Sequence, residues 1–209
     1  METYLTEEER VEALQRWWKE NRSSLAWGVI MGLAVIAGWK YWQGHQQVQR
    51  EQASFAYHIV GQALTAKKPD EAVKAAEHLI ENYSSTTYAD FARITLAKLK
   101  ASAGDLEAAK LRLEEEVNQG HDETLKDLAR LRLARVLLAQ GNFDAGLSVL
   151  KNSEKTAGQF SALLEEVRGD LLVATKRTEE GRSAYLKAKE LGNRSPLLEL
   201  KIHDLPAAG

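Results

Sequence analysis

The sequence predicts an all-α protein in which one N-terminal transmembrane helix precedes a solenoid of paired helices. Three observations support this fold class. An uncharged stretch runs from Ser23 to Trp39. The remainder is rich in Ala, Leu, Glu, Lys and Arg, which are strong helix formers, and the chain has only three prolines. Similar segments also recur roughly every 37 residues, a period typical of two-helix repeats.

The apolar stretch Leu25–Trp42 is long enough to cross a membrane. The uncharged residues cover roughly 26 Å as a helix, close to the hydrocarbon thickness of about 30 Å, and Lys40 can extend its ammonium group outward. A buried core helix fits less well because the other segments are amphipathic. A cleaved signal peptide fits less well because no small-residue cleavage site follows the stretch. Aromatic side chains mark both edges, as at membrane interfaces: Trp27, Trp39, Tyr41 and Trp42.

The flanking cations predict the orientation of this helix. Four closely precede it (Arg10, Arg16, Lys19 and Arg22), whereas only Lys40 and Arg50 follow it at a similar distance. Because Lys and Arg stay on the cytoplasmic side, the N-terminus is predicted to be cytoplasmic and the C-terminal part translocated. The predicted organisation is a cytosolic amphipathic leader (1–22), a transmembrane helix (23–42), a translocated helical-repeat domain (43–205) and a loose tail (206–209).

Two features of the first 42 residues are candidate contact sites. Val11, Leu14, Trp17 and Trp18 share one face of the leader, which either lies on the inner leaflet, docks a cytosolic partner or simply leads into the membrane helix. Gly28 and Gly32 form a G-x-x-x-G pattern, which lets two membrane helices approach closely. We therefore take Gly28 and Gly32 as a candidate membrane helix–helix contact, with lipid-facing residues as the alternative.

Composition argues against several function classes. A formal net charge of −2 favours no general attraction to nucleic acid. The absence of cysteine excludes disulfides, thiolate metal sites and a Cys nucleophile. The five histidines are scattered without metal-ligand spacing, and no Walker A or G-x-S-x-G motif is present. The sequence therefore predicts a non-catalytic protein without cofactor or metal, and the run Glu114–Glu116 is interpreted as a solvated helix face.

Helical segments and short breaks alternate after the membrane helix. Pro69 suits the first turn of a helix, and glycines 104, 120, 141 and 192 are expected to end helices. The helix that follows the membrane stretch is expected to be nearly continuous with it. Helices are predicted over residues 48–66, 71–83, 88–103, 106–119, 124–140, 143–152, 159–175, 179–191 and 196–203.

The repeat is visible in two pairs of segments. ARITLAKL at 92–99 matches ARLRLARV at 129–136, and GDLEA at 104–108 matches GNFDA at 141–145. Weaker copies run over 163–185 and about 54–79.

The repeated units resemble tetratricopeptide repeats. That motif needs small residues where the two helices of a unit cross closely. The first helices carry Ala97, Ala134 and Gly169 at this place, with Gly61 expected in the first unit; the second helices carry Ala109, Gly146 and Gly181, followed by the large residues Leu113, Leu150 and Tyr185. The sequence departs from the motif in lacking the closing proline, and the early aromatic is replaced by Arg93, Arg130 and Glu165.

Stacked helix pairs of this kind form a concave surface lined by the first helix of each unit. The repeat register predicts an apolar groove of mixed charge, suited to a helix or an extended segment. The alternative is that the apolar members of this set are simply core residues. The candidate groove residues are Phe91, Ile94, Lys98, Leu128, Leu131, Arg135, Leu138, Leu163, Glu166 and Asp170.

The whole chain resembles the YfgM family of bacterial inner-membrane proteins. The resemblance rests on Val11-Glu12-Ala13 and Trp17-Trp18 in the leader, on Gly28–Gly32 and Gly38–Trp42 in the membrane helix, and on a repeat domain of matching size. It implies a single-pass protein of the inner membrane with periplasmic repeats. It also implies association with the SecYEG translocon and the membrane-anchored periplasmic chaperone PpiD.

On this basis the predicted function is a membrane-anchored periplasmic adaptor. It would assist the handover of translocated polypeptides, with the lipid bilayer as its other partner and no nucleic acid. Two alternatives remain open. The leader could sequester a cytosolic signalling factor, or the protein could be a scaffold for envelope assembly.

Overall fold

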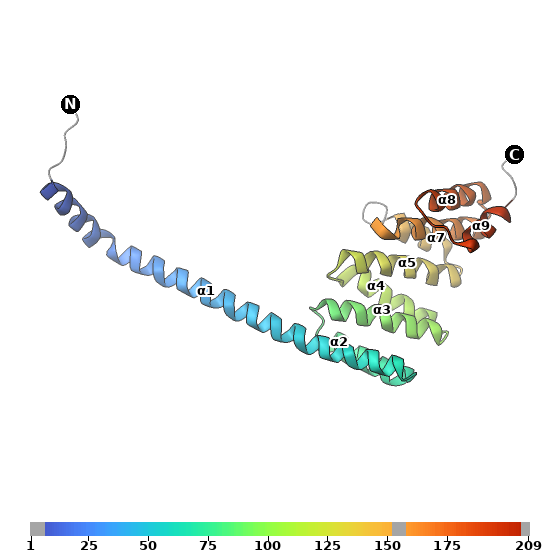
Figure 1. Cartoon of the computed structure of the whole chain (residues 1–209), viewed down its shortest axis with the longest axis horizontal. Coiled ribbons are helices and arrows are strands. Elements are labelled where there is room, and N and C mark those ends of the chain that lie inside the picture. The colour runs from blue at the N-terminus through green and yellow to red at the C-terminus, as the bar shows by residue number, and fades with distance from the viewer. Residues whose placement is uncertain (1–6, 152–157, 206–209) are drawn as a thin grey trace, which may run out of the picture. The chain divides into compact units, whose positions relative to one another are not determined.

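A computed structural model describes residues 7–151 and 158–205, and these residues confirm the all-α fold class (Figure 1). They contain helices, one 3-10 turn and no strand. The chain divides into two compact units between Val48 and Gln49. The predicted tail and the first six residues of the leader lie outside the described residues.

The helices follow the predicted segments to within a few residues. The first repeat helix continues the membrane stretch, as expected, and the described part of the leader belongs to the same helix, α1. The elements are α1 (Glu7–Thr65), α2 (Pro69–Asn82), α3 (Thr87–Ser102), α4 (Leu106–Gln119), α5 (Glu123–Ala139), α6 (Phe143–Lys151), η1 (Gly158–Phe160), α7 (Ser161–Ala174), α8 (Thr178–Glu190) and α9 (Pro196–His203).

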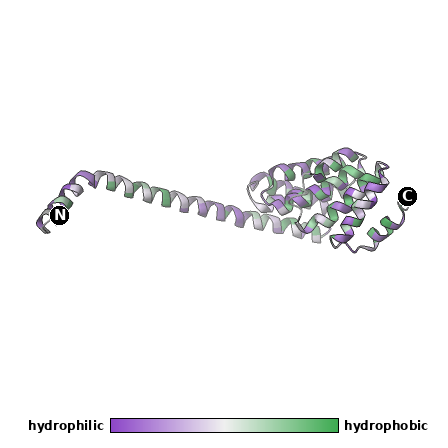
Figure 2. Ribbon diagram, turned by 90° about the horizontal axis from the view of Figure 1, so that it is seen from above, coloured by the Kyte–Doolittle hydropathy of each residue, from purple (hydrophilic) through white to green (hydrophobic). Residues whose placement is uncertain are grey.

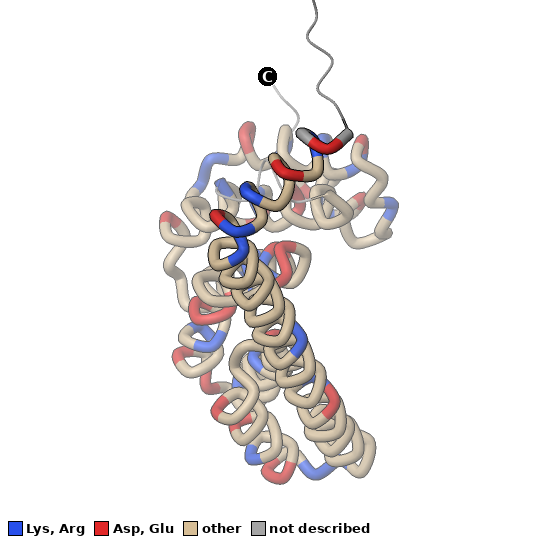
Figure 3. Tube along the Cα trace, turned by 90° about the vertical axis from the view of Figure 1, so that its left-hand side faces the viewer, with Lys and Arg blue, Asp and Glu red and all other residues tan. Residues whose placement is uncertain are grey.

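The N-terminal unit consists of the first part of α1. It contains the one described stretch that is long and apolar enough to cross a membrane, and none of that stretch is buried in the protein. Met31 and Val35 are 67% and 72% exposed. Figure 2 shows this stretch in green and white between purple turns, and Figure 3 shows it as a tan run that follows the charged leader. In water such exposure of large apolar side chains is unfavourable, so the stretch needs an apolar environment.

The C-terminal unit is built from helix pairs, each of which contacts its neighbours along the chain. The end of α1 pairs with α2, and the later pairs are α3 with α4, α5 with α6, and α7 with α8. The core divides in the same way. One buried cluster joins α1, α2 and α3, a second joins α3, α4 and α5, and a third joins α5, α6 and α7. This nearest-neighbour packing is the property that defines a solenoid.

Small residues occupy the close helix crossings that the repeat predicts. Ala97 and Ala134 are 2% and 0% exposed. A Cβ at Gly169 would overlap the ring of Tyr185, and one at Gly146 would lie 2.8 Å from Cδ2 of Leu171. The prediction is wrong for Gly61, which is exposed and has nothing within 4 Å of a Cβ. The first unit therefore does not cross closely at that residue.

The glycines that end helices do so in two ways. Gly104 and Gly141 adopt φ values of 83° and 78°, a left-handed conformation that favours glycine after a helix. Gly120 instead has φ −57°. A Cβ there would overlap the carboxylate of Glu116. Gly120 is therefore required for space beside a buried acid rather than for its backbone conformation.

A buried ion cluster joins α3 to α4 and to the loop between α4 and α5. Arg93 is 2% exposed and its Nη1 lies 2.9 Å from Oδ1 of Asp90 and 3.4 Å from Oε2 of Glu116. Its Nε donates to Oε1 of Glu115 at 3.1 Å. The backbone N–H of His121 donates to Oδ2 of Asp90 at 2.9 Å. At this position of the repeat motif, the Arg93 guanidinium thus takes the place of the expected aromatic side chain.

This cluster corrects the interpretation of Glu114–Glu116 as a solvated face. Glu116 is 0% exposed, and its Oε1 has no hydrogen-bond partner among the described atoms. Burial, reinforced by the neighbouring Asp90 carboxylate, raises the pKa of Glu116 to about 7 despite the attraction of Arg93. Between about pH 4.5 and pH 7, the Glu116 carboxyl is therefore protonated in the folded protein and ionised in the unfolded chain.

Glu116→Gln is expected to change how stability depends on pH. Since the folded-state pKa is raised, the stability that protonated Glu116 contributes is fully present below the unfolded pKa of about 4.5 and is lost as pH rises through about 7. At about pH 8 the variant should be more stable by roughly 1–3 kcal/mol, and this gain should vanish below about pH 4.5. Urea unfolding of both chains across this range measures the difference, and a difference independent of pH would contradict the assignment.

Candidate functional site

The predicted groove residues lie at equivalent repeat positions on α3, α5 and α7. Lys98, Arg135 and Asp170 each directly follow the small residue of their helix. Lys98 and Arg135 are exposed, and Phe91 is 38% exposed. Phe91 also packs against Tyr57 of α1, with ring centroids 5.7 Å apart. These side chains are the accessible members of the predicted set.

The aliphatic members of the set contribute mostly to packing. Ile94 and Leu131 are 5% and 1% exposed, so neither offers a surface to a partner. Three further members are half-buried against the cluster that contains Leu131: Leu128, Leu138 and Leu163. The accessible groove is therefore more polar than the sequence pattern suggests.

The acidic members of the set are bound by the chain's own C-terminal helix. Lys201 of α9 lies 2.7 Å from Oε1 of Glu166 and 2.7 Å from Oδ1 of Asp170. Asn193 donates to Glu166 at 2.7 Å, and the hydroxyl of Tyr185 donates to Asp170 at 2.7 Å. Lys201 was not singled out from the sequence, because its partners lie more than 30 residues away. The acidic end of the predicted groove is thus already paired with a cation of α9.

These contacts determine the charge states of Glu166 and Lys201. Burial opposes the charged form of Glu166, but hydrogen bonds from Lys201 and Asn193 outweigh burial and lower the pKa of this carboxyl. Burial likewise opposes the ammonium of Lys201, and its two carboxylate partners nevertheless raise its pKa. Both groups are charged at neutral pH, so this is an ion pair that holds α9 against α7.

A basic pocket of about 430 Å³ lies between α3, α4 and α5. Its charged side chains are Lys98, Arg132 and Arg135, and the rest of its lining is Ala97, Ala101, Ser102, Leu113 and Val136. Arg132 donates to the carbonyl oxygen of Ile94 at 3.4 Å. Burial and the neighbouring Arg135 lower the pKa of Arg132. Sequence reasoning placed Lys98 and Arg135 on this surface but missed Arg132, which follows the buried Leu131 and precedes the buried Leu133.

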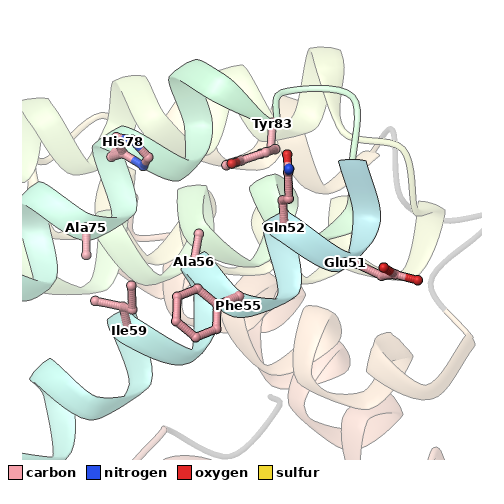
Figure 4. A pocket seen from close by; sticks show the side chains of 8 residues that line it. All are labelled: Glu51, Gln52, Phe55, Ala56, Ile59, Ala75, His78 and Tyr83. Carbon is pink, nitrogen blue, oxygen red and sulfur yellow. The ribbon is translucent and has the colours of Figure 1, made fainter. Parts of the chain in front are cut away.

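An open apolar pocket of about 730 Å³ lies between the end of α1 and α2. Figure 4 shows Phe55 and Ile59 on one wall and Ala75, His78 and Tyr83 on the other. Phe55 is 69% exposed and Ile59 is 43% exposed. Sequence reasoning missed this pocket, although the spacing of Phe55 and Ile59, four residues apart on one helix face, was the available signal.

The two membrane glycines lie in the N-terminal unit. A Cβ at Gly28 or Gly32 would meet nothing within 4 Å, so this chain itself tolerates larger side chains there. The leader's apolar residues are also exposed: Val11, Leu14, Trp17 and Trp18. Among residues 7–151 and 158–205, no group of three or more His, Asp or Glu side chains is arranged to hold a metal ion.

Comparison with known proteins identifies the family. The model of the tetratricopeptide repeat-like domain family matches residues 15–207. A protein of Escherichia coli (strain K12) named "Ancillary SecYEG translocon subunit" is 34% identical over 98% of this chain and 99% of its own length. A protein of the same name from Haemophilus influenzae is 30% identical over 96% of this chain and 98% of its own.

A solved structure supports the fold. MamA from Desulfovibrio magneticus RS-1 (residues 41 to the end) superposes with a TM-score of 0.60 at 18% identity, covering 72% of this chain and 81% of that one. This similarity supports the arrangement of helices alone. The family match and the near-full-length relatives show more: the chain belongs to the YfgM family, the tetratricopeptide-repeat-like proteins whose curated members are named ancillary SecYEG translocon subunits.

Proposed function

We propose that this protein is a membrane-anchored adaptor that associates with the SecYEG translocon and holds its repeat domain in the periplasm. The observation that carries the proposal is the similarity to the Escherichia coli protein, which extends over 98% of this chain and therefore includes the membrane helix. Similarity to a relative over the repeats alone would support a binding domain, but it would say nothing of where in the cell that domain acts.

The physical role of the anchor is to raise local concentration. A repeat domain confined beside the exit of the translocon meets emerging chains and their chaperones at a high effective concentration, without needing tight contacts. We infer that a membrane-anchored periplasmic chaperone of the PpiD type is one of its partners and that translocated polypeptides are handed over there. The accessible groove residues and the α1–α2 pocket are the surfaces available for these contacts.

Gly28 and Gly32 are the residues proposed to meet a translocon helix. Gly28→Ile with Gly32→Ile is expected to reduce co-purification of SecYEG from detergent-solubilised membranes by tenfold or more, because side chains at both sites prevent close helix approach. The repeat domain should unfold at the same temperature, since neither site contacts other side chains.

The matched control is Val29→Leu with Val35→Leu, which keeps the volume change small and leaves both glycines in place. Retention of SecYEG by the double isoleucine variant would reject the helix–helix contact. Failure of the wild-type chain to retain any translocon subunit would reject the proposed function itself.

A further inference from the structure

We propose that the basic pocket between α3, α4 and α5 binds carboxylates of an acidic, partly apolar peptide segment in a partner protein. The inference rests on the proposed adaptor function and gives the chemistry of one of its partner sites. The pocket combines three cations with an apolar lining, which suits a segment that carries both carboxylates and aliphatic side chains.

The charges in this pocket are not balanced within the chain. Among the described residues, no carboxylate forms an ion pair with Lys98, Arg132 or Arg135. Arg135 does act through space on Glu166, but that carboxylate is already bound by Lys201 and Asn193. The pocket therefore presents three cations that an external anion would neutralise.

Placing these cations close together disfavours the charged form of Arg132. Its guanidinium is partly buried next to a like charge, which lowers its pKa. An incoming carboxylate relieves that repulsion and accepts hydrogen bonds from the guanidinium, and such charge-assisted bonds are stronger than neutral ones. Guanidinium groups also bind carboxylates in a bidentate manner that an ammonium does not match.

The equivalent position on α7 carries the opposite charge and has a partner within the chain. At the repeat position of Lys98 and Arg135, α7 carries Asp170, and this carboxylate binds Lys201 of α9. Next to that ion pair, Leu198 of α9 is buried in an apolar cluster with Tyr185 and Ala188. The helix α9 is thus held by one of its own cations, paired with α7, and by apolar packing against α8. At α3 and α5 the charges are reversed, so the complementary segment is acidic.

Fluorescence anisotropy with the full-length protein in detergent tests this inference. The probe is a fluorescein-labelled peptide of about twelve residues with Glu and Leu at helical spacing, and its control has every Glu replaced by Gln. We expect the Glu peptide to bind at least tenfold more tightly than the Gln peptide. Arg135→Glu should weaken binding of the Glu peptide by tenfold or more, whereas Lys74→Glu, the same charge change on exposed α2, should leave binding unchanged.

Three results would overturn the inference: equal binding of the two peptides, no binding of the Glu peptide, or equal binding by Arg135→Glu and wild type. Displacement of the peptide by phosphatidylglycerol mixed micelles, to the same extent as by unlabelled peptide, would assign the pocket to lipid headgroups instead. The translocon assay is independent of this test. If SecYEG still co-purifies while the peptide fails to bind, only the pocket assignment is lost.

Discussion

Replacing Arg93 with methionine is expected to destabilise the repeat domain by about 3–5 kcal/mol. Among the described residues, the guanidinium is the one Lys or Arg group in contact with Asp90 and Glu116, and both carboxylates are 0% exposed. Asp90 also contacts Nδ1 of His121 at 3.1 Å, whereas Glu116 has no such second partner in the described part of the chain. Its removal leaves uncompensated acidic groups inside the protein. This cost is much larger than that of losing an exposed ion pair, which is about 0–1 kcal/mol.

Urea unfolding followed by circular dichroism of the full chain in detergent measures this loss. The matched control is Arg177→Met, which removes an exposed pair with Glu180 and should cost at most about 1 kcal/mol. At about pH 8, adding Glu116→Gln to Arg93→Met should recover part of the stability, because the neutral amide needs neither a cation nor the uptake of a proton when it is buried. A free energy of unfolding for Arg93→Met within about 1 kcal/mol of wild type would contradict the role of the cluster.

Placing arginine at the centre of the apolar stretch is expected to abolish membrane integration. Leu33 and Ile36 are 62% and 57% exposed, so neither side chain is buried among the neighbouring residues of its own helix. Each arginine at the centre of a membrane helix costs about 2.5–3.5 kcal/mol on insertion scales. Leu33→Arg with Ile36→Arg therefore costs more than the remaining apolar residues are expected to offset.

Carbonate extraction of membranes separates integral from peripheral protein. The wild type and the control Leu33→Ala with Ile36→Ala should remain in the membrane pellet, and the double arginine variant should appear in the supernatant. If the arginine variant also resisted extraction, the apolar stretch would not be what retains the protein.

The helices were predictable because their signals are local. Asp105 and Asp122 cap α4 and α5 by accepting from backbone N–H groups at 2.8–3.0 Å, and Pro69 lies at the first turn of α2. Such signals require only neighbouring residues. The burial of Glu116 was not predictable in this way, because Arg93 lies 23 residues before it. The missing aromatic at Arg93 was the hint that polar packing replaces apolar packing there.

The sequence predicted which residues share a repeat position, but it did not predict which side chains those residues contact. Repeat positions placed Lys98, Arg135 and Asp170 at equivalent places, since that inference needs only the period of the sequence. The pairing of Asp170 with Lys201 depends on where α9 packs, 31 residues further on. The pocket that includes Arg132 depends on the spacing of three helices. Distances between helices are tertiary properties that a single sequence pattern does not contain.

The orientation of the repeat domain is the central claim, and single-cysteine labelling tests it most directly. Because the chain has no cysteine, each introduced thiol reports without background. Ser148→Cys lies at an exposed site on α6, and Glu12→Cys lies at an exposed site on the leader. In intact spheroplasts, a membrane-impermeant maleimide should label Ser148→Cys, and it should label Glu12→Cys only after the membrane is permeabilised. Labelling of Glu12→Cys in intact spheroplasts, with Ser148→Cys protected, would contradict a periplasmic repeat domain.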